Sequence, residues 1–147
     1  MEVFEEQLMS IQVGMVSLGL EYVQGQAEKI YIYAIADSLH SFNLFFQIKE
    51  EIVKIHKVNT VLPHPVDASD QMMFALLDYG IEDISKIIQL CQQYQREHPT
   101  EMWLIYDNVT NSLDVKYSYE GRYSKDEELL PRLEFDKWFK EVKNSSL

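Results

Sequence analysis

The side chains that could bind a metal are few and isolated from one another along the chain. No histidine has a second histidine, a cysteine or a carboxylate at the spacing of a metal-binding motif such as His-x-x-x-His. An isolated histidine is more often a surface or helix-end residue than a ligand, so the sequence predicts no metal site. The four histidines are His40, His56, His64 and His98.

The residues that could act as nucleophiles lack the partners that activate them. No Gly-x-Ser-x-Gly turn is present, and Cys91 lies in an apolar periodic segment where a buried thiol is ordinary. The five glycines are scattered rather than clustered, so they form no phosphate-binding loop. The sequence therefore predicts a protein that is not an enzyme and has no cofactor.

Acidic residues outnumber basic ones by 24 to 13, which gives a formal net charge of -11. This charge repels nucleic acid and attracts basic partners at long range. Adjacent acids diverge on a helix or strand, which favours solvated charge over acid–base catalysis. Near the carboxyl end, however, acids surround Tyr119 and Tyr123, a combination suited to a basic protein surface. The partner-binding residues predicted in this segment are Glu120, Tyr123, Asp126, Glu127 and Glu128.

Length and composition predict one folded domain over residues 1–147. Hydrophobic residues make up 46% of the chain and aromatic residues 12%, which argues against disorder. No apolar run approaches the roughly 18 residues of a membrane span, and the first six residues carry acids where a signal peptide carries bases. Together with the single cysteine, these features predict a cytoplasmic protein without membrane contact.

Apolar spacing and turn residues predict the order α-β-β-β-α-β-β-α. A stripe of apolar residues marks each helix, and the last one carries the aromatic positions Phe135, Trp138 and Phe139 on one face. Gly80 is expected to kink or split the long second helix. The predicted helices cover residues 4–22, about 70–97 and 131 onward, and the predicted strands cover 29–36, 42–48, 52–58, 101–107 and 113–120.

This order predicts an α+β fold in which helices cover one face of an antiparallel sheet. Three aromatic residues fall on the other face if Ile30 and Ile32 point to the core, and exposed aromatics on a sheet are good anchors for a partner. Two readings stay open for that face, because a helix could also cover it. The three aromatic residues are Tyr31, Tyr33 and Phe45.

Three segments carry a resemblance to a known family: Lys29 to Ala34, Pro99 to Asp107, and Asp114 to Glu120. With the helices that surround them, their order and spacing resemble the YezG-like immunity, or antitoxin, proteins of bacteria. Members often enter the first strand through a segment with Pro and Trp, whereas this chain has Val23 to Glu28 there. The entry loop is therefore expected to contact something different.

The resemblance implies a cytoplasmic protein that binds and silences a cognate toxin domain, in several cases a nuclease, by stoichiometric binding. A nuclease presents a cationic cleft, which agrees with an acidic inhibitor. The family has no catalytic residues to transfer. Two alternatives remain: a small-ligand binding protein or enzyme with a pocket between the sheet and the long helix, suggested by the nine tyrosines, and a homo-oligomer that buries the exposed aromatics.

Overall fold

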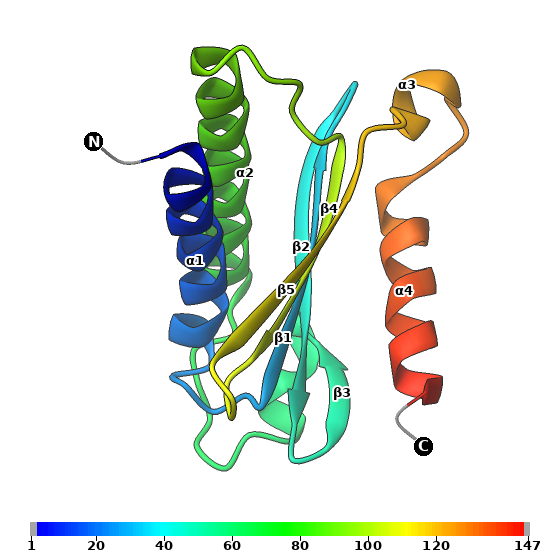
Figure 1. The fold of residues 1–147 in the computed structure, drawn as a ribbon. Helices are drawn as coiled ribbons and strands as arrows, with labels where there is room; N and C mark the ends of the chain where they lie inside the picture. Colours follow the sequence, from blue (N-terminus) through cyan, green and yellow to red (C-terminus); the bar gives the residue numbers. More distant parts are fainter. Residues whose placement is uncertain (1–2, 146–147) are drawn as a thin grey trace.

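The computed structural model describes residues 3–145, and Figure 1 shows a single sheet between helices. The two residues at each end, which belong to the acidic start and the polar tail of the sequence, lie outside the described residues. The helices are α1 (Phe4–Tyr22), α2 (Asp70–Gln93), α3 (Arg122–Lys125) and α4 (Pro131–Ser145), with a 3₁₀ helix η1 (Ile55–Thr60). The strands are β1 (Lys29–Ala36), β2 (His40–Ile48), β3 (Glu51–Lys54), β4 (Glu101–Asp107) and β5 (Ser112–Ser118).

The five strands form one antiparallel sheet in the order β3-β2-β1-β4-β5. The predicted α+β class and element order are thus confirmed, as is the β4–β5 hairpin, in which Trp103 pairs with Lys116. The third strand is shorter than predicted, because the chain turns into η1 at Ile55. Among residues 3–145, no helix combines the length and the apolar character needed to cross a membrane.

The first face of the sheet packs against α1 and α2 (Figure 1). Alternate strand residues such as Ile32, Leu44 and Leu104 point to these helices and are fully buried. Helix α2 is continuous rather than broken at Gly80. A Cβ at Gly80 would lie 2.1 Å from the Phe42 ring, so glycine lets the helix approach the sheet.

The second face is covered in part by α4, which decides between the two readings left open for that face (Figure 1). The aromatic stripe of α4 meets the aromatics of β1 and β2: Trp138 packs edge-on against Tyr31 and Phe45, with centroid distances of 5.8 and 5.1 Å. Asp136 forms an ion pair with Lys54 of β3. Because α4 lies over β2 and β3, no helix covers the second face of β4 and β5 in the described residues.

Candidate functional site

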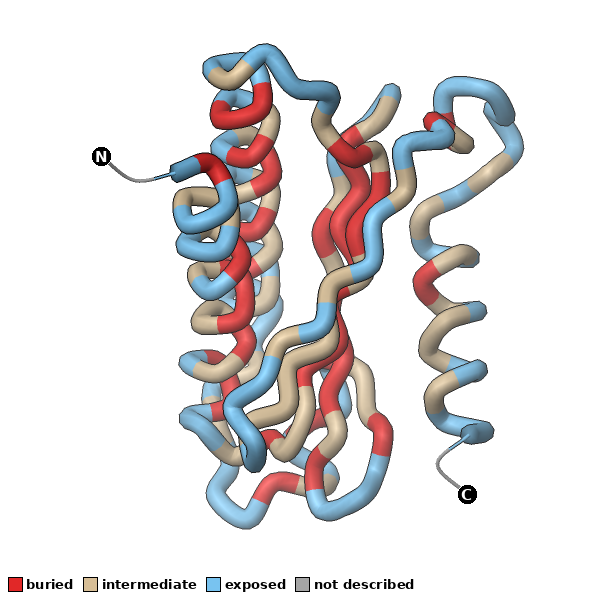
Figure 2. Tube along the Cα trace, in the orientation of Figure 1, coloured by how far each residue is buried: buried red, intermediate tan, exposed pale blue. Residues whose placement is uncertain are grey.

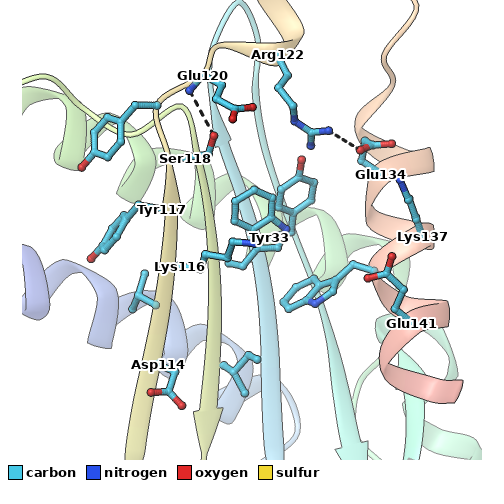
Figure 3. Close-up of a pocket in the computed structure, with 15 residues that line it drawn as sticks. Tyr33, Asp114, Lys116, Tyr117, Ser118, Glu120, Arg122, Glu134, Lys137 and Glu141 are labelled. Carbon is cyan, nitrogen blue, oxygen red and sulfur yellow. Dashed lines mark hydrogen bonds and ion pairs between the residues drawn. The ribbon is translucent and has the colours of Figure 1, made fainter. Parts of the chain in front are cut away.

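An open groove of about 810 Å³ lies between the second face of β4–β5 and helix α4 (Figure 3). The groove exists because α4 packs over the β2–β3 half of the second face and leaves the β4–β5 hairpin without a covering helix on that face. Its lining residues come from β1, β4, β5, the segment after β5 and α4: Tyr33, Trp103, Ile105, Asp114, Val115, Lys116, Tyr117, Ser118, Tyr119, Glu120, Arg122, Glu134, Lys137, Trp138 and Glu141.

The floor of the groove is aromatic. The ring of Trp103 on β4 stacks on Tyr33 with a centroid distance of 5.3 Å. The ammonium group of Lys116, on β5, lies 5.3 Å from the centroid of the Trp103 ring. The alternation of β5 brings Asp114, Lys116 and Ser118 to this same face. Rigid strands thus hold apolar rings and charged groups side by side, which is the composition of a binding surface.

One end of the groove is closed by a buried ion-pair network. Glu101 is fully buried, and Arg122 donates to it through both Nε and Nη2, at 2.8 and 2.5 Å. The Nη1 of Arg122 donates to Glu134 of α4 at 2.9 Å. Tyr33 donates a further hydrogen bond to Glu101, and its hydroxyl lies 2.9 Å from that of Tyr123. The network therefore joins β4, β1, α3 and α4.

The network raises the pKa values of three of its members, Tyr33, Tyr123 and Arg122. Burial, followed by hydrogen bonding to Glu101, raises the pKa of Tyr33 far above its ordinary value. Burial also raises the pKa of Tyr123 to about 12. Hydrogen bonds to Glu101 raise the pKa of Arg122, although burial opposes this. The two tyrosines therefore stay neutral and Arg122 stays charged near neutral pH, and the hydrogen bonds among these residues position the segment after β5.

Asp37 ties α3 to the β1–β2 turn. Its carboxylate accepts hydrogen bonds from the backbone N–H groups of Tyr123 and Ser124, at 2.9 and 3.2 Å, and from the Ser124 hydroxyl at 2.7 Å. Gly121 precedes α3 with φ of +68°, a left-handed conformation that glycine adopts without strain. Together these features return the chain toward the second face, where α4 begins.

The structure divides the predicted acidic site. Glu120 lines the groove (Figure 3) and is an exposed residue. The acids Asp126, Glu127 and Glu128 are exposed in the loop between α3 and α4, outside the groove. The Asp126 carboxylate accepts a hydrogen bond from the Glu128 N–H, so it shapes this loop.

Four of the residues predicted to bind a partner are buried, and for Tyr31, Tyr33 and Phe45 this decides between the two readings left open. Tyr31, Tyr33 and Phe45 are 6%, 2% and 0% exposed, because α4 and the Glu101 network cover them. Tyr123 is equally buried, with its hydroxyl against Tyr33. Of these four, only Tyr33 borders the groove.

The sequence prediction missed the residues that build the floor of the groove. Trp103 and Lys116 carry a usable signal, because strand alternation places both on the same face as Tyr33 once β1 and β4 are paired. Glu101 carries none: an acid at the start of a strand is ordinarily exposed, and its burial depends on Arg122, which lies 21 residues further along the chain.

In the part of the chain that the structure describes, no three or more His, Cys, Asp or Glu side chains form a group that could hold a metal ion. Comparison of the chain with models of known protein families finds no match, and comparison with curated proteins finds none either. The resemblance to the YezG-like proteins therefore stays a prediction.

Proposed function

We propose that this chain is a cytoplasmic immunity protein that neutralises a bacterial toxin domain by stoichiometric binding through the groove. The observation that supports this most is the charge of an otherwise aromatic, open surface. The carboxylates of Asp114, Glu120 and Glu141 all line the groove, and within residues 3–145 none of the three forms an ion pair.

These carboxylates favour a basic partner. Two lysines, Lys116 and Lys137, also line the groove, so the local charge is mixed and suits recognition of a particular arrangement of charges. The net charge of -11 adds long-range attraction to a cationic surface. A toxin that binds phosphate, such as a nuclease, has a surface of this kind, and an acidic protein bound there would exclude its substrate.

The test is to co-express the chain with the protein encoded immediately upstream and to ask whether that protein is toxic alone. We expect growth rescue and a one-to-one complex. The groove variant Asp114→Asn, Glu120→Gln, Glu141→Gln should slow association by about tenfold at low salt, because it removes steering charge next to the contact.

A matched variant separates the groove from net charge. Glu50→Gln, Glu51→Gln, Glu82→Gln removes the same number of charges at exposed positions outside the groove. Equal slowing by both variants would place the interface elsewhere while leaving immunity intact. The absence of both toxicity and a complex would refute the immunity function.

Small-ligand binding is the second candidate, at a different place from the one predicted. The interface between the sheet and α2 is filled by side chains such as Ile84 and Ile87, which are 0% and 1% exposed. The groove volume of about 810 Å³ does fall within the roughly 300–1,000 Å³ of ligand pockets. A rise in melting temperature with a metabolite panel, lost on Trp103→Ala, would favour this candidate.

A further inference from the structure

Strand β5 forms one edge of the sheet, and its outward backbone groups can be assigned from its neighbours. The N–H of Ala36 donates to the Thr100 carbonyl and the N–H of Asn108 donates to the Glu28 carbonyl, so even-numbered residues of β4 bond to β1. Odd-numbered residues of β4 then bond to β5, because backbone groups alternate in direction along an antiparallel strand.

The same alternation fixes β5. The residues that pair with the odd-numbered ones of β4 are even-numbered, from Ser112 to Ser118. The N–H and carbonyl groups of Leu113, Val115 and Tyr117 therefore point away from the sheet. Figures 1 and 2 show β5 in front of the other strands, with no element of the described chain lying across it. An uncovered edge of seven residues without proline or glycine is a template for strand pairing.

The opposite edge of the sheet is protected. Strand β3 has four residues and runs directly into η1, so it offers little length for pairing. Asp136 of α4 also binds Lys54 at its end. The two edges thus differ in length and cover, and only β5 has the form of an interface.

The sequence of β5 complements itself when two copies run antiparallel with Val115 opposite Val115. This register uses the outward groups of Leu113, Val115 and Tyr117, as the ladder requires. It sets Asp114 of one copy opposite Lys116 of the other, twice, on the groove face. On the first face it sets Leu113 opposite Tyr117, again twice. Opposite charges and apolar pairs directly across a ladder are both stabilising.

Helix α1 supplies a second, independent observation. Gln12 of α1 donates to the Tyr117 hydroxyl at 2.7 Å, and Gly14 faces Asp83 of α2, so the side of α1 toward β5 is known. At about 100° per residue, Met9 and Val13 lie beyond Gln12 on the flank away from α2. They are 46% and 50% exposed, and their position on the helix, next to Gln12 and away from α2, places them on the side where a further strand beside β5 would lie.

We propose that two copies of this chain form a symmetric dimer by pairing their β5 strands, with Val115 on the two-fold axis. The ten strands then make one continuous sheet, and Met9 and Val13 of each copy cover the junction. Because the two-fold axis is perpendicular to the sheet, both grooves open on the same side. In the dimer Asp114 pairs with Lys116 of the other copy, so Glu120 and Glu141 are the groove carboxylates that stay without an ion pair within the described residues. This inference does not depend on the proposed immunity function and is tested on the chain alone.

Charge exchange tests the register. Sedimentation velocity should show a dimer for the unmodified chain at micromolar concentration. Asp114→Lys or Lys116→Asp alone should each weaken the dimer by about tenfold, because each places two like-charged pairs across the axis. The double variant Asp114→Lys, Lys116→Asp restores opposite charges at both pairs and should restore the dimer. A heterologous contact would show no such rescue.

Val115→Pro tests the backbone contact. The N–H that it removes points outward in the single chain, so the fold should be retained, as circular dichroism can verify. The dimer should be lost. The proposal is overturned by a monomer at all concentrations up to about 1 mM, by single charge variants that the double variant does not rescue, or by a dimer that Val115→Pro leaves intact.

Discussion

The two faces of the sheet are built from the same strands but are closed in different ways. On the first face, α1 and α2 cover the sheet, and the buried side chains there are almost entirely apolar. On the second face, α4 covers one half with aromatics, and the other half combines the groove with the Glu101–Arg122 network. The first face supplies a sealed core, whereas the second keeps an open surface whose shape depends on polar contacts.

The largest expected effect comes from a cavity on the first face. Ile84 of α2 is fully buried, so Ile84→Ala should lower the free energy of unfolding by about 3–4 kcal/mol. Urea denaturation followed by circular dichroism measures this. Tyr79→Ala on the same helix is the control, since Tyr79 is 57% exposed and should change stability by under about 0.5 kcal/mol. Equal losses at both positions would mean that α2 does not seal this face.

A smaller effect is expected from the polar network of the second face. Glu101→Gln should cost about 2 kcal/mol, because Arg122 loses its buried partner but keeps Glu134. Hydrogen exchange should then rise in α3 and α4 more than in α2. Faster exchange confined to α3 and α4 would show that this network, more than burial, holds these two helices beside the groove.

A double variant sharpens that result. Adding Arg122→Met to Glu101→Gln should recover part of the loss, since it removes the Arg122 charge that Glu101→Gln leaves without its buried partner. The recovery is only partial because Glu134 then loses its ion pair with Arg122. Glu141→Gln is the control, because this acid lines the groove but is exposed and outside the network. Strictly additive losses would contradict a coupled network.

The predictions from sequence succeeded where the deciding interactions are local. The β4–β5 hairpin follows from alternation and an Asn-containing turn, and α4 begins at Pro131 as predicted. The third strand was predicted too long, because η1 is stabilised by burial of Ile55 and Val58 rather than by any turn residue. Local patterns thus determined the elements better than their ends.

The site was predicted less well, because it depends on contacts distant in sequence. The aromatic stripe of α4 indicates that the helix docks but not on which face, so the sequence leaves open whether Tyr31 and Phe45 are exposed. In the structure they lie beneath α4. Of the predicted acids, only Glu120 lines the groove. The burial of Glu101 follows from a partner in another element, which no spacing rule reveals.

The smallest expected effects concern how folding stability depends on pH. Asp37, which holds α3, and Asp83, on helix α2 of the first face, should change the free energy of unfolding with opposite signs. Burial alone would raise the pKa of Asp37, but hydrogen bonds from Ser124 and Tyr123 together outweigh burial and hold this pKa below its ordinary 3.8. On the first face, burial raises the pKa of Asp83 despite Lys86 at 3.5 Å. The ionised form is therefore favoured by folding at Asp37 and disfavoured at Asp83.

The two asparagine variants should separate these cases in urea titrations between pH 3 and 7. Asp37→Asn should lose about 1 kcal/mol at pH 7, and the deficit should shrink as the pH falls below 3.8 toward the lowered pKa of the folded state. Asp83→Asn should be neutral or stabilising by under about 1 kcal/mol at pH 7. Its gain should vanish below 3.8, where the carboxyl is protonated in both states. If both differences changed with pH in the same direction, polar contacts would serve the two faces alike, and the contrast between a sealed face and an open one would fail.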